Sequence, residues 1–112
     1  MIIAMTYLNE EIFPHFGKSE YFVVYEVENK EVKSKKIYQL EGSGHASKAA
    51  FLKEMHADVL ICGGMGMHAK EAIDSVGVSV YAGQSGNTDE VLKEFLEGKL
   101  IANELAIHSC CH

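Results

Sequence analysis

Short apolar runs and amphipathic segments alternate along the chain. Residues 1–7 (MIIAMTY) and 58–62 (DVLIC) are continuous apolar runs, a pattern typical of buried strands. Residues 21–41 predict a hairpin, because β-branched and aromatic residues flank a polar turn near Asn29 and Lys30. The second arm of this hairpin alternates more regularly than the first, which predicts a position at the edge of a sheet.

Three segments predict helices. In residues 42–57, Ala49, Leu52 and Met55 recur at three-residue spacing. Further along, four apolar positions follow the i, i+3, i+4, i+7 pattern of an amphipathic helix. These positions are Ala69, Ala72, Ile73 and Val76. In residues 87–98, Asn87 is a candidate N-cap and Gly98 a candidate stop.

The elements therefore follow the order strand, hairpin, helix, strand, helix, strand, helix. The last strand before the third helix is VSVYA (78–82). Alternating strands and helices require parallel strands with crossover connections, and the hairpin adds one antiparallel strand. We expect a single α/β domain over 1–112, with a mixed five-stranded sheet, helices on both faces, and residues 103–112 as a Cys/His tail that can be flexible.

Composition narrows the classes of function. The chain has 112 residues, a net charge of −6 and ten basic residues, all of them lysine. An acidic chain without arginine is a poor candidate for binding nucleic acid. Apolar runs are too short to span a membrane, and the N-terminus lacks a basic leader, so we expect a cytoplasmic protein without a membrane partner. Three cysteines without a signal peptide predict reduced thiols.

The segment LICGGMGMHAKEAI (60–73) is the strongest candidate for a binding site. It places Gly63, Gly64, Met65 and Gly66 between a buried strand and a helix. Ligands of open α/β sheets bind beyond the carboxyl ends of strands, where glycines expose backbone N–H groups and a helix N-terminus favours anions. The alternative is a tight turn that needs glycine for positive φ. Cys62 and His68, which flank the glycines, favour a site.

Two other interpretations of this segment remain open. GMGMHA (64–69) formally fits a dinucleotide-binding pattern, but the next strand does not end in an acidic residue that could bind a ribose. Cys62 could act as a catalytic thiol, although a buried cysteine more often serves as a small hydrophobic residue.

Further candidate ligands lie in the tail and in two loops. The tail contains His108, Cys110, Cys111 and His112 within five residues, and thiolates and imidazoles bind zinc, copper(I) and iron–sulfur species. His15 and His45 lie in loops that leave carboxyl ends of strands if the first strand is central. His56 receives no function. Three lysines near these loops could screen an anionic ligand, but each is expected to be solvated: Lys18, Lys48 and Lys70.

Several of these motifs together resemble the dinitrogenase iron–molybdenum cofactor biosynthesis and binding family. The resemblance rests on FPHFG (13–17), GSGHA (42–46), DVLICGGMG (58–66), GVSVYAG (77–83) and CCH (110–112). It implies a ribonuclease H-like α/β/α sandwich and the binding of an iron–molybdenum or iron–sulfur cluster. By the same resemblance, His15, His45, Cys62 and the turn 63–66 form the cofactor side, with Cys110, Cys111 and His112 as auxiliary ligands.

The resemblance in fold does not carry nuclease chemistry with it. Nucleases of this fold hold magnesium with carboxylates, one of them on the first strand, and MIIAMTY contains no acidic residue. The leading hypothesis is a non-enzymatic carrier that delivers an anionic metal–sulfur cluster to, or receives it from, a metalloprotein. The alternatives are a metal-independent interaction module and a thiol enzyme that uses Cys62.

Overall fold

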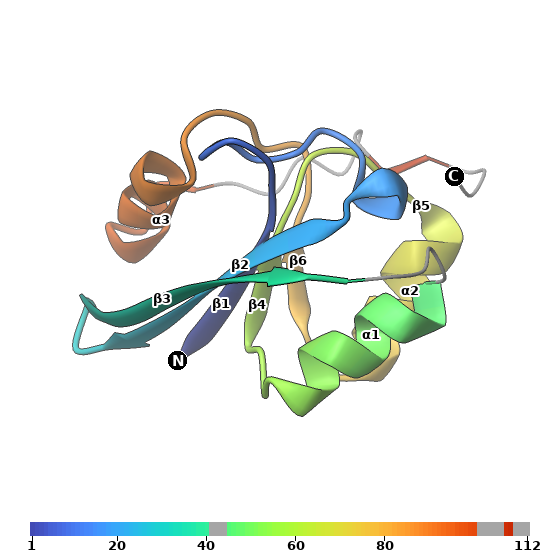
Figure 1. Ribbon diagram of the computed structural model, residues 1–112, viewed down its shortest axis with the longest axis horizontal. Coiled ribbons are helices and arrows are strands. Elements are labelled where there is room, and N and C mark those ends of the chain that lie inside the picture. The colour runs from blue at the N-terminus through green and yellow to red at the C-terminus, as the bar shows by residue number, and fades with distance from the viewer. Residues whose placement is uncertain (41–44, 101–106, 109–112) are drawn as a thin grey trace.

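A mixed sheet of five strands forms the centre of the protein (Figure 1). The structure is a computed structural model, which describes residues 1–40, 45–100 and 107–108. The strands are β1 (Ile2–Tyr7), β2 (Tyr21–Glu28), β3 (Glu31–Gln39), β4 (Val59–Ile61) and β6 (Ser79–Tyr81), in the order β3-β2-β1-β4-β6. β1 pairs in parallel with β4, and β4 with β6, whereas β2 is antiparallel to both neighbours. The predicted sheet, with one antiparallel strand, is confirmed.

Helices cover both faces of this sheet (Figure 1). α1 (His45–Glu54) and α2 (Met67–Ser75) pack on one face, and α3 (Thr88–Leu96) packs on the other. Successive residues of a strand point to opposite faces. In β1, Ala4 therefore packs with α1 and α2, while Ile3 and Met5 pack with α3. The α/β/α layering implied by the family resemblance is present.

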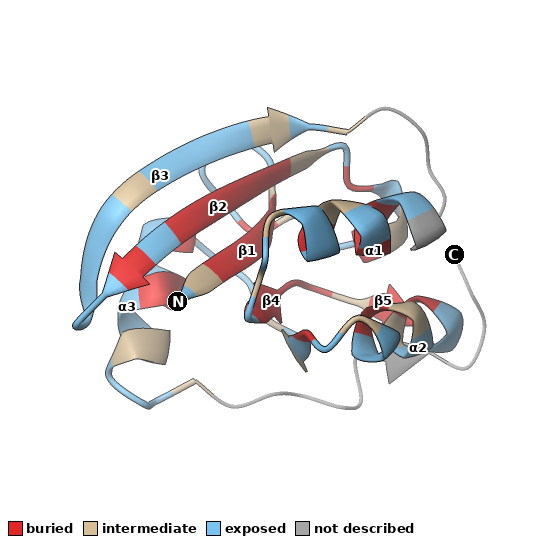
Figure 2. Cartoon of the chain, turned by 90° about the horizontal axis from the view of Figure 1, so that it is seen from below, coloured by how far each residue is buried: buried red, intermediate tan, exposed pale blue. Residues whose placement is uncertain are grey.

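The hairpin of β2 and β3 lies at one edge of the sheet, as its pattern predicted. Asn29 and Lys30 both adopt positive φ, 52° and 64°, which is the backbone of the tight turns that match the twist of a hairpin. Figure 2 shows β3 almost entirely exposed beside the buried β2. Strand β1 occupies the middle of the sheet, so the loop that follows it opens at a central position.

Helix α3 begins and ends where the sequence predicted. The Asn87 side chain accepts hydrogen bonds from the backbone N–H groups of Asp89, at 2.9 Å, and Glu90, at 3.2 Å. Beyond the last turn, Gly98 adopts φ 75° and its N–H donates to the carbonyl of Phe95. Both signals are local, since each depends on residues within one turn of the helix end.

Two short strands lie outside the main sheet. β5 (Met65–Gly66) pairs in parallel with β7 (Ile107–His108), with Gly66 opposite His108. This pairing brings residues near the end of the chain to the glycine segment. Among the residues that the structure describes, no helix is both long and apolar enough to cross a membrane.

Candidate functional site

The loop after β1 and the glycine segment after β4 meet at one end of the sheet. β1 and β4 are parallel neighbours, so their carboxyl ends lie side by side. The Phe16 N–H donates to the Gly64 carbonyl at 2.9 Å, and the Gly64 N–H donates to the Pro14 carbonyl at 2.7 Å. These two hydrogen bonds join FPHFG to the glycine segment across about fifty residues of sequence.

Gly63 is required by the close approach of this loop. A Cβ atom at Gly63 would lie 2.6 Å from the Pro14 carbonyl oxygen and 2.7 Å from the Pro14 Cα. Gly63, Gly64 and Gly66 do not adopt positive φ, so the tight turn considered as the alternative is not what requires glycine here. The Gly63 carbonyl also accepts a hydrogen bond from Gly83. Gly63 is thus a packing position beneath the loop.

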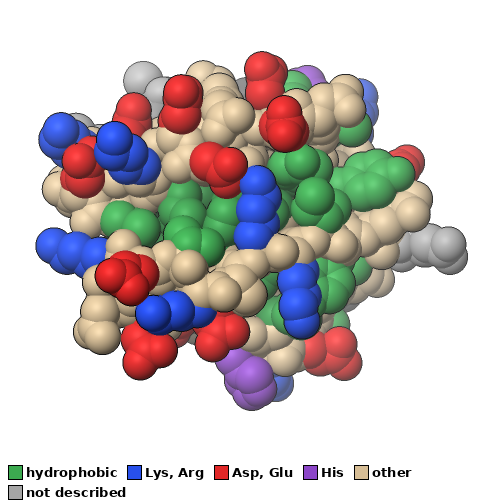
Figure 3. All heavy atoms as spheres, turned by 60° about the vertical axis from the view of Figure 1, so that its left-hand side comes forward, with side chains coloured by type: hydrophobic (Ala, Val, Ile, Leu, Met, Phe, Trp, Pro, Cys, Tyr) green, Lys and Arg blue, Asp and Glu red, His purple; other side chains and the backbone are tan. Residues whose placement is uncertain are grey.

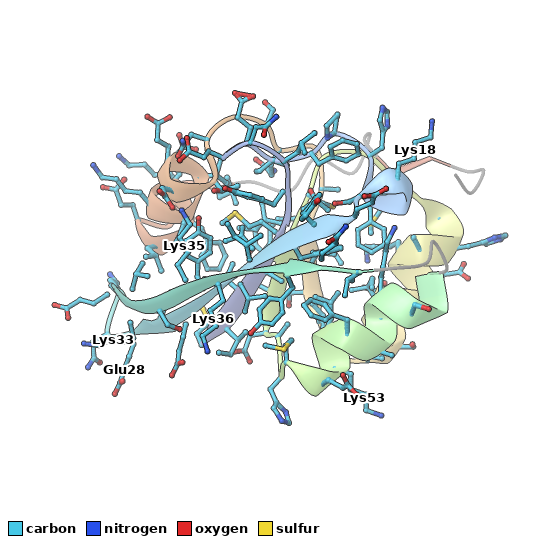
Figure 4. The ribbon with its side chains drawn as sticks, viewed as in Figure 1. Lys18, Glu28, Lys33, Lys35, Lys36 and Lys53 are labelled. Carbon is cyan, nitrogen blue, oxygen red and sulfur yellow. The ribbon has the colours of Figure 1, made fainter. Side chains whose placement is uncertain are left out.

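The two segments enclose a pocket of about 270 Å³. Its lining combines one imidazole, one exposed ammonium and stretches of backbone: His15, Phe16, Gly17, Lys18, Gly64, Met65 and Gly66. Short helix η1 (Phe16–Lys18) forms one wall, and the Lys18 side chain extends outward from it (Figure 4). The sequence predictions for His15, Gly64, Met65 and Gly66 therefore fall on a single concave surface.

Helix α2 starts at this pocket. Its N-cap is Gly66, which has no side chain that could cap the first turn. The first N–H groups of a helix lack intrahelical partners, and the aligned peptide dipoles place partial positive charge there. An uncapped helix start beside a pocket lined by glycine backbone favours an anionic ligand.

Cys62 lies in the core rather than at the pocket surface. Its exposure is 0%, and burial raises the pKa of its thiol to about 12. The Cys62 N–H donates to Tyr81 at 3.1 Å, and its carbonyl accepts from Gln84 at 3.0 Å. A thiol with so high a pKa is a poor nucleophile near neutral pH, which argues against the thiol-enzyme hypothesis. Cluster binding by Cys62 stays a prediction.

The other predicted residues have different placements. His45 begins α1, three residues before Lys48. His68 is exposed in the first turn of α2, outside the set that lines the pocket. Cys110, Cys111 and His112 lie outside the described residues. The β5–β7 pairing nevertheless places the backbone of residue 108 directly beside Gly66.

The prediction that Lys48 is solvated is wrong. Lys48 is 1% exposed, and its ammonium donates hydrogen bonds to the carbonyls of Phe16, at 2.9 Å, and Gly17, at 2.8 Å. The sequence contained a signal for this burial, because Lys48 precedes Leu52 by four residues and so shares its apolar helix face. The other two lysines agree better with the prediction: Lys18 is exposed, and Lys70 is partly exposed in an ion pair with Asp74.

Within residues 1–40, 45–100 and 107–108, no group of three or more His, Cys, Asp or Glu side chains is arranged to hold a metal ion. His15 is the imidazole at the pocket, and its ring makes an edge contact with Phe13 at 6.3 Å between centroids. A bare metal ion, which needs several protein ligands, finds few of them here. An anion that already carries its own ligands needs far fewer.

The sequence model of the dinitrogenase iron-molybdenum cofactor family matches residues 1–98. The chain belongs to this family. An uncharacterised protein of Methanocaldococcus jannaschii is 35% identical to it over an alignment of 106 residues, and the match covers 89% of each chain. The resemblance inferred from FPHFG, DVLICGGMG and the other motifs is confirmed at the level of the family.

The fold of this chain is also similar to that of solved structures. The crystal structure of PH0822 superposes with a TM-score of 0.85 at 30% identity, covering 92% of this chain and 95% of that chain. The apo form of the orange protein from Desulfovibrio gigas superposes with a TM-score of 0.75 at 22% identity, covering 91% and 92%. At that identity the second likeness concerns the fold alone.

Proposed function

We propose that this protein binds an anionic metal–sulfur cluster in the pocket between η1 and α2 and carries it to or from a metalloprotein, without catalysing a reaction. Membership of the dinitrogenase iron-molybdenum cofactor family supports the binding of a metal–sulfur cluster. The observation that carries the proposal is the chemistry of the pocket, which offers His15, the backbone of residues 64–66 and the uncapped start of α2.

This lining fits a cluster better than a metal ion. A cluster of the iron–molybdenum or iron–sulfur type brings sulfide ligands for its own metals and carries net negative charge. The pocket then needs to supply charge complementarity and one or two anchoring ligands rather than a complete coordination shell. His15 is the anchor among the described residues.

The tail supplies the remaining ligands in this proposal. Pairing of β5 with β7 holds the chain beside Gly66 at residue 108, and Cys110 follows only two residues later. The covalent chain limits the distance from residue 108 to about 7 Å for Cys110 and about 11 Å for Cys111. Thiolates at these positions are suitable ligands for iron, copper or molybdenum.

Anaerobic loading tests the proposal. The protein is incubated with iron and sulfide, or with tetrathiomolybdate, then desalted and examined by metal analysis and by charge-transfer absorption. We expect retained metal and absorption bands in the wild type, and weaker binding in His15→Ala and in a chain that ends at His108. His56→Ala is the matched control, because His56 is exposed in the turn after α1 and lies outside the pocket lining.

Two results would contradict the proposal. Failure of the wild type to retain any metal would favour the metal-independent interaction module. Equal retention by the wild type, His15→Ala and the shortened chain would show that metal binds elsewhere.

A further inference from the structure

Lys48 is a buried positive charge that no acid of the described residues neutralises. Its side chain enters from α1 and is 1% exposed. The ammonium has two neutral acceptors, the carbonyl oxygens of Phe16 and Gly17, and lies 5.3 Å from the centre of the Phe16 ring. Within the described part of the chain, no carboxylate lies within 4.0 Å of this ammonium.

Such an arrangement is costly for the fold. Removing an ammonium from water without an opposite charge has a large desolvation penalty, which carbonyl dipoles and a ring face offset only in part. Burial accordingly lowers the pKa of Lys48. If the side chain only filled space, a methionine or leucine would occupy this position at a lower cost.

The position of the charge indicates its use. Phe16 and Gly17, whose carbonyls hold the ammonium, are themselves part of the pocket lining. The charge therefore lies directly behind one wall of the pocket, and the opposite wall ends at the uncapped start of α2. In a partly desolvated site, charges act on one another more strongly than they do in water.

We propose that Lys48 is a positioning residue that holds η1 in place and places a positive charge behind the pocket wall. The pocket then selects its ligands by their net negative charge. This inference rests on the proposed function and adds a selection rule to it. Between two ligands of the same shape, the pocket binds the more negative one more tightly, and the charge of Lys48 causes this preference.

Two tetrahedral sulfur-bearing anions of similar size test this rule. Tetrathiomolybdate carries two negative charges and tetrathiorhenate carries one. Dissociation constants of both are measured anaerobically for the wild type, Lys48→Met, Lys48→Gln and Lys48→Arg. Glutamine keeps a hydrogen-bond donor for the carbonyls but removes the charge, whereas arginine keeps the charge but changes the shape.

If the charge of Lys48 attracts the ligand, removing it should cause a loss of affinity that grows with the negative charge of the anion. In Lys48→Gln we expect tetrathiomolybdate to bind about tenfold or more weakly, and tetrathiorhenate to lose clearly less. Lys48→Met should show the same ordering, and Lys48→Arg should keep most of the preference. Lys53→Met, an exposed lysine in the last turn of α1, is the control and should bind like the wild type. Circular dichroism and amide spectra establish that each variant is folded.

Equal losses for the two anions would overturn the selection rule and leave Lys48 as a structural support for η1. No loss for either anion in the glutamine variant would overturn both roles. If the wild type binds neither anion, the proposed function fails and this inference fails with it, which differs from a wild type that binds both anions without dependence on Lys48.

Discussion

Two lysines on opposite faces of the sheet have different kinds of partner. On the α3 face, Lys35 of β3 lies near the start of α3 and forms an ion pair with Asp89 at 3.0 Å (Figure 4). On the other face, Lys48 is buried, and its acceptors among the described residues are the neutral carbonyls of Phe16 and Gly17. Of these two lysines, Lys35 therefore pairs with an acid, whereas Lys48, beside the pocket, pairs with no carboxylate of the described residues.

Polar groups on the α3 face satisfy one another. The Tyr25 hydroxyl donates to Asp89 at 2.6 Å and lies 2.9 Å from the hydroxyl of Thr88, which is 1% exposed. Burial and then the hydrogen bond to Asp89 raise the pKa of Tyr25, against a smaller opposing effect of Thr88. Tyr25 and then Lys35 lower the pKa of Asp89. Figure 3 shows positive and negative side chains lying next to one another on this side of the molecule.

The helix starts differ in the same way. Asn87 caps α3 with its side chain and satisfies two N–H groups, whereas Gly66 leaves α2 without a side-chain cap. At the start of α3, the cap and the Lys35–Asp89 ion pair are thus formed within the protein. The α1/α2 face has a helix start with a glycine N-cap and a buried lysine near the pocket, which is an arrangement that favours an anion.

Gly63→Ala should have the largest effect on stability, because it disturbs a backbone contact beside the pocket. The new Cβ would meet the Pro14 backbone at 2.6 Å, so the loop 13–17 must move. We expect the free energy of unfolding to fall by about 3 kcal/mol, as measured by urea denaturation, together with loss of cluster retention. Gly77→Ala is the control: its Cβ would meet open space, and the positive φ of 81° should cost about 1–2 kcal/mol without affecting retention. A Gly63→Ala protein with wild-type stability would show that the loop does not need this contact.

Tyr25→Phe should remove hydrogen bonds on the α3 face and leave the pocket on the other face unchanged. It removes the hydroxyl that contacts Thr88 and Asp89 and leaves the buried Thr88 hydroxyl without this partner. We expect the free energy of unfolding to fall by about 1.5 kcal/mol in urea denaturation. Retention of tetrathiomolybdate should be unchanged, and a weakened retention would mean that the two faces are coupled.

Asn87→Ala tests the capped helix start. Loss of the side-chain acceptor for Asp89 and Glu90 should reduce the free energy of unfolding by about 1 kcal/mol, measured by thermal or urea denaturation. Asn87→Ser keeps a capping oxygen and should recover most of the loss. Equal effects of alanine and serine would assign the loss to some other contact of Asn87.

The smallest effect is expected for Asp89→Asn, and it depends on pH. The pKa of Asp89 is lowered in the folded protein, so its contribution is present above the unfolded value of about 3.9 and disappears as the pH falls through the folded value. Because Asp89 is largely exposed, the difference in unfolding free energy between wild type and variant should be below about 1 kcal/mol at pH 7. Denaturation from pH 7 to pH 2 should show this difference shrinking below about pH 4. A difference that grows toward low pH would have the wrong sign for this ion pair.

Local patterns in the sequence determined the order and type of the elements. The Asn29–Lys30 turn, the Asn87 cap and the Gly98 stop each depend on neighbouring residues, and each lies where its pattern predicts. The exposed edge strand β3 also followed from its regular alternation. Sequence further identified the loop 13–17 and the glycine segment as binding candidates, and the structure joins them in one pocket.

The reasons for individual site residues came only from the tertiary structure. Gly63 is glycine because Pro14, about fifty residues earlier in the chain, contacts it, and no pattern near Gly63 reveals that neighbour. Cys62 lies within the core because both faces of β4 are covered by helices. Lys48 looked like a surface lysine because lysine usually is one, yet its burial depends on η1 lying over the start of α1. Periodicity along the chain fixes which face of an element is apolar, whereas the contact between distant segments decides which polar group becomes buried there.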